Sequence, residues 1–255
     1  MKRFKHSGAT GDLVYSLALV KHFGGGEFYL HLDQINWIGK HYYGSNPDPF
    51  HQGRMNQADF EYMRDFMQAQ SYIAAFKILD RDTEITHNLD RFRPLFVGHP
   101  GNYVDVYAAA FGITDPETRK SMRTAPWLTV PKAVKHEGRS VVINRTPRWT
   151  PATLSDQWSK WRNEGMEERA LFVGLEQEYD LFTKTLGWDI PYIQTRSQLD
   201  LASVIAGAEV FIGNQSQALA LAVGLGVPYY CEARTDLPLA RNECWFPDQP
   251  GSNYF

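Results

Sequence analysis

The chain has 255 residues, 43% of them hydrophobic and 22% charged, so it is long enough for one large domain or two ordinary ones and is not a disordered segment. Its 26 basic and 29 acidic residues leave a net charge of −3, which does not indicate a nucleic-acid partner, although a local basic patch is compatible with such a total. The 2 cysteines provide neither a disulfide framework nor zinc-ligand spacing, and no apolar run reaches the roughly 18 residues of a membrane span. We therefore expect a cytoplasmic protein.

The beginning of the chain predicts a strand, a turn, a helix and a second strand. Residues 2–6 form a short candidate strand, and the glycine-rich turn SGATGD follows at 7–12. Residues 13–23 have apolar side chains at helical spacing, and three glycines end this helix. Residues 27–32 then read as the second strand. A doubly wound α/β sheet begins in this order.

The rest of the first half has weaker periodicity. The patterns predict an irregular loop at 36–52, helices at 59–68 and 102–111, and strands at 71–79 and 92–97. Residues 129–139 combine proline, glycine and charge without periodicity, which is typical of a linker between domains.

The second half alternates strictly between short apolar strands and helices. The predicted strands are 140–144, 169–173, 191–194, 209–212 and 227–231, and the predicted helices are 153–163, 177–186, 197–206 and 216–225. Such alternation indicates a parallel sheet with both faces covered. We expect an α/β protein of two domains, 1–132 and 133–255, whose tail from residue 235 packs back on the first domain.

The turn at 7–12 is the first candidate site. Gly8 and Gly11 allow close approach to the backbone, and the N-terminus of the following helix favours an anion. Asp12 allows two interpretations. On pattern alone a carboxylate that caps the helix is the commoner role. At the carboxyl end of the first strand, however, Asp12 also has the position of a general base for an acceptor hydroxyl.

Two further candidates follow strands of the second half. The loop INRTPRW at 143–149 contains Arg145, Thr146 and Arg148, which suit phosphate oxygens about as well as a solvated surface. Glu178, or Glu176 beside it, has the position of a carboxylate that binds ribose hydroxyls. A carboxylate stabilised by the helix dipole is an equally good explanation.

The last candidate is the segment FIGNQSQALALAVGLGVPYY at 211–230. Asn214, Gln215 and Ser216 lie between a strand and a helix of small residues, where backbone N–H groups can hold a diphosphate. A well-capped packing helix is the alternative. The 8 histidines have no metal-ligand spacing, so we expect no metal and no cofactor.

With these motifs the chain resembles glycosyltransferase family 9, the heptosyltransferase-like family of GT-B glycosyltransferases. The segment GATGDLVYSLALVK at 8–21 resembles the family's Gly-x-x-Gly-Asp turn and helix, and FIGNQSQALALAVGLGVP at 211–228 resembles its second glycine-asparagine turn and Ala-rich helix. The resemblance implies two Rossmann-like domains that face each other across a cleft. It also implies inverting, metal-independent transfer from a nucleotide diphosphate sugar, with Asp12 as the base, the 143–149 loop at the diphosphate and Glu178 near the ribose.

The chain departs from the family in the second turn. The family continues with Asp-Thr/Ser-Gly and a later His, whereas this chain has Gln215, Ser216 and Gln217, with Ala220 where the His falls. A heptose donor therefore does not follow. The chain is also shorter than typical members of the family, so a lipopolysaccharide acceptor does not follow either, and a modified DNA base in a phage context stays open. The alternatives are a sugar-nucleotide epimerase or hydrolase on the same scaffold, or a non-catalytic nucleotide-binding module.

Overall fold

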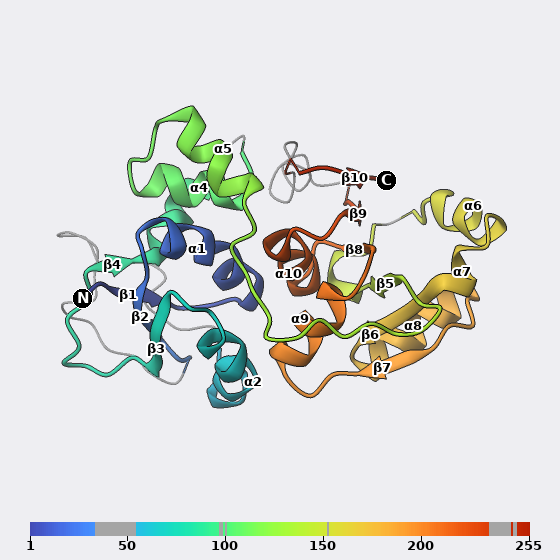
Figure 1. Cartoon of the computed structure of the whole chain (residues 1–255), viewed down its shortest axis with the longest axis horizontal. Helices are drawn as coiled ribbons and strands as arrows, with labels where there is room; N and C mark the ends of the chain where they lie inside the picture. The colour runs from blue at the N-terminus through green and yellow to red at the C-terminus, as the bar shows by residue number, and fades with distance from the viewer. Residues whose placement is uncertain (34–54, 97–98, 100, 152, 235–245, 247–248) are drawn as a thin grey trace. The chain divides into compact units, whose positions relative to one another are not determined.

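The computed structural model describes residues 1–33, 55–96, 99, 101–151, 153–234, 246 and 249–255 (Figure 1). The chain divides into two compact units, Met1–Thr129 and Val130–Phe255, each with its own sheet. The irregular loop expected at 36–52 lies outside the described residues. The assignment of one unit to the acceptor and the other to the donor stays a prediction.

The first unit contains a four-stranded sheet with the order β3-β2-β1-β4, in which every pair is parallel. Its strands are β1 (Arg3–His6), β2 (Gly26–Leu30), β3 (Ile73–Ile78) and β4 (His87–Asn88). Its helices are α1 (Thr10–His22), α2 (Gln57–Gln68), η1 (Leu89–Phe92), α3 (Arg93–Phe96), α4 (Tyr103–Ala110) and α5 (Pro116–Thr124). The predicted opening of strand, turn, helix and strand is confirmed.

The glycines that end α1 are required by the packing of the sheet. Gly25 has φ +78°, and a Cβ on it would lie 1.9 Å from the carbonyl oxygen of Tyr72. Gly26 begins β2, where all five residues are buried. A larger side chain at Gly25 would therefore push the start of β2 away from β3.

One prediction for the first unit is wrong, and one helix was missed. Residues 92–97 were expected to form a strand, but Phe92 ends η1 and Arg93–Phe96 form α3. The actual strand, β4, has only two residues and so produces no periodic pattern. Helix α5 was not predicted, although Asp115 caps it by accepting from Thr118 N at 2.8 Å and Pro116 begins it, both of which are common start signals.

The second unit contains a six-stranded parallel sheet with the order β10-β9-β8-β5-β6-β7. Its strands are β5 (Val141–Asn144), β6 (Ala170–Gly174), β7 (Tyr192–Gln194), β8 (Val210–Asn214), β9 (Tyr229–Glu232) and β10 (Asn253–Tyr254). Its helices are η2 (Pro147–Trp149), α6 (Gln157–Asn163), α7 (Met166–Arg169), α8 (Glu176–Leu186), α9 (Gln198–Ala206) and α10 (Gln217–Leu225). Numbered from β5, this is the order 3-2-1-4-5-6 of dinucleotide-binding sheets, and the predicted parallel α/β class is confirmed.

Aromatic side chains fill the core of the second unit. Trp158 and Trp188 lie 5.7 Å apart in an edge-to-face arrangement, and both are fully buried. The described end of the tail adds β10 to the sheet edge, and Phe255 packs 4.6 Å from Trp161. These rings are therefore part of the packing of the second unit. The packing of the tail on the first domain stays a prediction.

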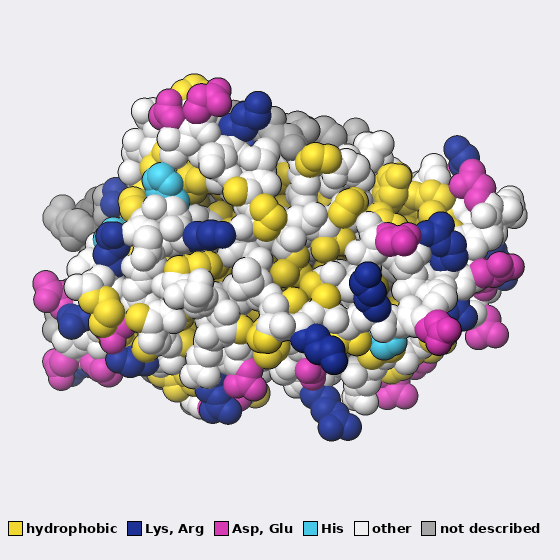
Figure 2. Space-filling view, viewed as in Figure 1, with side chains coloured by type: hydrophobic (Ala, Val, Ile, Leu, Met, Phe, Trp, Pro, Cys, Tyr) yellow, Lys and Arg dark blue, Asp and Glu magenta, His cyan; other side chains and the backbone are white. Residues whose placement is uncertain are grey.

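Charged side chains of both signs are interspersed on the surface. On the face seen in Figure 2, Lys and Arg alternate with Asp and Glu over both units, and the described residues form no continuous basic stripe there. This distribution agrees with the net charge of −3 and gives no indication of a nucleic-acid surface on that face.

Candidate functional site

The carboxyl edge of the first sheet gathers the first group of polar residues. Strand β1 lies between β2 and β4, so its carboxyl end is the point where the strand order reverses, which is where α/β sheets bind ligands. The loop from β1 to α1 turns at Gly8, whose φ of +88° favours glycine. Gly11 and Asp12 follow in the first turn of α1.

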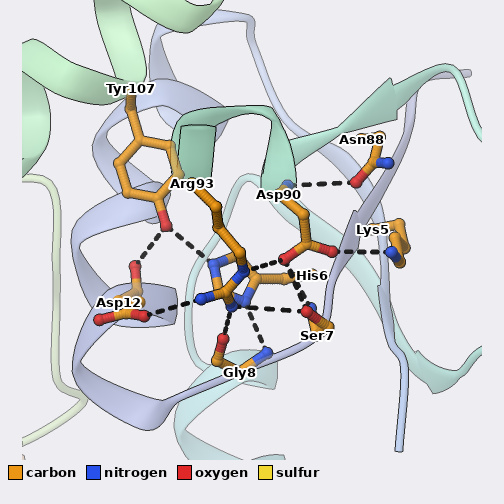
Figure 3. A network of polar contacts seen from close by, with 9 residues as sticks. All are labelled: Lys5, His6, Ser7, Gly8, Asp12, Asn88, Asp90, Arg93 and Tyr107. Atoms are coloured by element: carbon orange, nitrogen blue, oxygen red, sulfur yellow. Dashed lines mark hydrogen bonds and ion pairs between the residues drawn. The ribbon is translucent and has the colours of Figure 1, made fainter. Parts of the chain in front are cut away.

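A buried ion pair supports this loop (Figure 3). Lys5 Nζ lies 2.7 Å from Asp90 Oδ2, and Asp90 Oδ1 accepts from Ser7 N at 3.2 Å and from Ser7 Oγ at 2.8 Å. Burial alone would raise the pKa of the Asp90 carboxyl, but the charge of Lys5 and the other positive groups around it hold that pKa well below its usual range. Asp90 is therefore an ionised anchor at neutral pH.

Arg93 joins this anchor to Asp12. Its Nε donates to Asp90 Oδ1 at 3.2 Å, its Nη1 lies 3.4 Å from Asp12 Oδ2, and its Nη2 contacts the carbonyl oxygen of Gly8. Burial would lower the pKa of Arg93, but the carboxylates of Asp90 and then Asp12 raise it. The guanidinium is 5% exposed and holds the glycine loop and Asp12 together (Figure 3).

His6 and Tyr107 complete the cluster. Gly8 N donates to His6 Nδ1 at 2.9 Å, so Nδ1 is an acceptor and the neutral ring carries its proton on Nε2. That nitrogen lies 2.8 Å from Tyr107 Oη, which in turn donates to the carbonyl oxygen of Asp12 at 3.0 Å. Burial and then the charge of Asp12 raise the pKa of Tyr107 well above its ordinary value, so the phenol stays protonated.

Asp12 is the accessible carboxylate of this cluster. Its side chain is 18% exposed, whereas that of Asp90 is fully buried. The N-cap of α1 is Ala9, which makes no side-chain cap bond, and Asp12 is the third residue of the helix. Asp12 is therefore not the N-cap residue, although its charge still suits the helix dipole. Its role as a base stays a prediction.

In the second unit, Asn214 holds the loop after β5. Its Oδ1 accepts from Thr146 N at 3.0 Å, and its Nδ2 donates to Thr146 O at 2.6 Å. The side chain of Asn214 is fully buried. Its amide therefore supports the backbone of Thr146, and it brings the ends of β5 and β8 together at the reversal of strand order.

Arg145 has a structural partner. Its Nε and Nη2 lie 2.6 Å and 3.2 Å from the two carboxylate oxygens of Glu232, and Trp158 Nε1 also donates to Glu232 at 2.8 Å. Arg145 is 3% exposed and Glu232 is fully buried. This geometry favours a structural ion pair, so of the two predicted arginines the exposed Arg148, in η2, is better placed to meet a ligand.

Glu178 and Ser216 meet at one asparagine. Glu178 Oε2 accepts from Leu175 N at 3.0 Å and lies 3.3 Å from Asn144 Nδ2, while Ser216 Oγ donates to Asn144 Oδ1 at 3.1 Å. Burial raises the pKa of the Glu178 carboxyl, although the bonds from Leu175 and Asn144 lower it in part. The predicted ribose and diphosphate contacts are therefore neighbours at the carboxyl edge.

Gln215 and Ser216 form the approach to α10. Gln215 Oε1 accepts from Arg234 N at 3.1 Å, so this side chain holds the loop after β9. Ser216 is the N-cap residue of α10 and makes no side-chain cap bond, because its hydroxyl is directed to Asn144. The backbone N–H groups of the first turn of α10 thus lie beside Asn144 and Thr146, where an anion is favoured.

The described part of the chain contains no group of three or more His, Cys, Asp or Glu side chains that could hold a metal ion. Within the same residues, no helix is long and apolar enough to cross a bilayer.

No protein-family model matches the sequence, and no curated protein matches it. Solved structures do match the fold. A family 9 glycosyltransferase from Veillonella parvula superposes with a TM-score of 0.58 at 8% identity, over 100% of this chain and 85% of that one. The dodecameric, iron-containing heptosyltransferase TibC, in complex with ADP-D-β-D-heptose, gives 0.51 at 13% identity. That match covers 98% of this chain, which spans 61% of TibC. The chain therefore has the fold of these glycosyltransferases.

Sequence reasoning missed several residues of these clusters. Asp90, Arg93 and Tyr107 reach the glycine loop from η1, α3 and α4, in segments without a recognisable motif. Asn144 was overlooked at the end of a strand that was itself predicted. A polar residue that ends an apolar strand was the one available signal for it.

Proposed function

We propose that the chain is a glycosyltransferase that transfers a sugar from a nucleotide diphosphate sugar to an acceptor hydroxyl, with inversion and without a metal ion. One observation carries the proposal: the second sheet has the nucleotide-binding strand order, and Thr146, Glu178, Asn214 and Ser216 gather where that order reverses. Similarity of fold to family 9 glycosyltransferases supports the same reading.

The parts of the donor would follow one another along the carboxyl ends of the strands. Its diphosphate would meet the N-terminus of α10, Thr146 and Arg148, and its ribose would meet Glu178 at the end of β6. Since neighbouring strands lie about 4.8 Å apart, the base would reach the end of β7. A cavity of about 520 Å³ opens there, lined by residues that include Ile193, Gln194, Thr195, Arg196 and Leu199. Its volume lies in the range of small-molecule binding sites.

ADP is the first nucleotide to test, because TibC was solved with ADP-D-β-D-heptose. The GT-B arrangement, with the carboxyl edges of the two sheets on either side of the donor, is part of the proposal. This chain has Gln215 and Ala220 where the family has Asp and His, so the identity of the transferred sugar is left open.

The chemistry is a direct displacement at the anomeric carbon. Asp12 takes the proton from the acceptor hydroxyl, the acceptor oxygen bonds to the anomeric carbon, and the bond from that carbon to the diphosphate oxygen breaks. The negative charge that develops on the diphosphate is stabilised by Arg148 and the N-terminus of α10. Arg93 and Tyr107 keep the carboxylate and the first turn of α1 in place for this step.

The test combines binding with turnover. Thermal shift and calorimetry with ADP, UDP, GDP and CDP and their sugar conjugates identify the donor, because a ligand of the native state raises its melting temperature. The matching sugar nucleotide is then incubated with a panel of acceptors that includes hydroxymethylated DNA. Asp12→Asn should bind the donor like the wild type and lose at least about 100-fold in turnover.

The exposed Asp65→Asn in α2 is the matched control and should keep full activity. An active Asp12→Asn protein would disprove its role as the base. Donor consumption without any acceptor would replace the transferase with a hydrolase or epimerase, and binding without consumption would indicate a non-catalytic module.

A further inference from the structure

Asn144 lies at the centre of the second cluster and has all of its amide atoms engaged. It is 4% exposed at the end of β5, between β6 and β8. Its Nδ2 donates to Val173 O at 2.9 Å and to Glu178 Oε2 at 3.3 Å, and its Oδ1 accepts from Ser216 at 3.1 Å. One side chain therefore connects three strand ends.

Two glycines leave room for Asn144. A Cβ on Gly174 would lie 2.6 Å from Asn144 Nδ2 and 2.6 Å from Glu178 Oε2, and the φ of Gly174 is +140°. A Cβ on Gly213 would lie 2.3 Å from the carbonyl oxygen of Asn144. Gly174, the last residue of β6, thus allows the close approach of the Asn144 amide, and Gly213, the residue before the end of β8, allows that of the Asn144 backbone.

The chemistry of the position requires an amide. Two N–H bonds must point to a carbonyl and a carboxylate, and one oxygen must accept from a hydroxyl. An aspartate has the same shape, but it would place a second carboxylate against Glu178 and leave Val173 O without its donor. An alanine would remove one hydrogen bond from each of the three partners, although Glu178 would keep its bond from Leu175 N.

Building on the proposed function, we propose that Asn144 is the positioning residue of the donor site and makes it selective for ribonucleoside diphosphates. By donating to Oε2 of Glu178, together with Leu175 N, it orients the carboxylate so that Oε1 receives the ribose hydroxyls. By accepting from Ser216, it holds the hydroxyl at the first turn of α10, where the diphosphate binds. Ribose and diphosphate recognition are therefore coupled through one side chain.

The experiment measures the affinities of ADP, 2′-deoxy-ADP and inorganic pyrophosphate by calorimetry. The wild type should prefer ADP to 2′-deoxy-ADP. Asn144→Asp should bind ADP about 10- to 100-fold more weakly, because a buried bond to a charged group is lost. The ratio of its affinities for ADP and 2′-deoxy-ADP should approach one. The matched control is Asn163→Asp on the exposed end of α6, which should change neither quantity.

A second route avoids substitution of Asn144. Glu178→Gln, Ser216→Ala and their combination form a double-mutant cycle for ADP binding. We expect the effects of the two substitutions on ADP affinity to be non-additive, because both side chains bond to Asn144. Additive effects, or an Asn144→Asp protein with wild-type ADP affinity and ribose preference, would overturn this inference and leave the proposed function intact. A wild type that binds no nucleoside diphosphate would overturn both.

Discussion

Glu232→Gln tests whether the buried ion pair with Arg145 stabilises the second unit. The substitution keeps the shape of the side chain and removes its charge, which leaves the guanidinium of Arg145, 3% exposed, without a counter-charge. Breaking a buried ion pair by removing one partner costs about 3–5 kcal/mol. We expect the free energy of unfolding of the second unit to fall by this amount.

The expected change is large on the scale of a domain. A domain of this size has a free energy of unfolding of about 5–15 kcal/mol. The second unit, Val130–Phe255, has an unfolding entropy of about 0.26 kcal/mol/K at about 2.1 cal/mol/K per residue. The melting temperature of this unit should therefore fall by roughly 11–19 °C.

The assay is urea denaturation followed by tryptophan fluorescence, because Trp158 donates directly to Glu232 and reports on its surroundings. The control is Glu209→Gln, which removes the exposed partner of Arg169 and should leave stability unchanged. A loss below about 1 kcal/mol for Glu232→Gln would refute the reasoning, since it would mean that Arg145 needs no buried counter-charge.

Two further predictions concern the first unit. Tyr107→Phe removes the hydroxyl between His6 Nε2 and Asp12 O, so the free energy of unfolding should fall by about 1–3 kcal/mol. Chemical denaturation measures this change, and an unchanged midpoint would contradict the proposed hydrogen bonds. The carboxylate of Asp90 has a lowered pKa, so its stabilising contribution is present above the unfolded value of roughly 3.9 and declines as pH falls below it. Asp90→Asn should therefore be less stable than the wild type at neutral pH, and the difference should narrow in an acid titration followed by circular dichroism; a constant difference would exclude this linkage.

The alternation of the second half was readable from sequence because each strand is a short apolar run between a glycine and a helix. Strands β5, β6 and β8 lie within a residue or two of their expected limits. Strand β4 escaped detection because two residues carry no period, and the segment after it is helical, not extended. Backbone pairing with β1 defines β4 as a strand, and the paired residues lie more than 80 positions apart in the chain.

The candidate site was readable where its signal is local. Asp12, Glu178 and Ser216 follow strands or begin helices, so their positions at the sheet edges could be expected. Their partners come from distant segments: Arg93 is 81 residues from Asp12, and no local pattern connects them. For Arg145, a local signal was present but its interpretation depended on a distant residue. Its residue type suggested phosphate, but a glutamate 87 residues away determines what it contacts.

The strand orders of the two sheets have a consequence for how the chain folds. In each unit the first strand in the chain, β1 or β5, is an interior strand with neighbours on both sides. Each sheet therefore has to form around a strand that is synthesised early. The second neighbour of that strand is synthesised much later. Pairing between such distant segments slows folding, and β1 stays open on one side until β4 has been synthesised. During that interval the unpaired backbone edge of β1 is exposed to other unfolded chains, so we expect the yield of folded protein to depend on keeping the nascent first unit dilute or chaperoned.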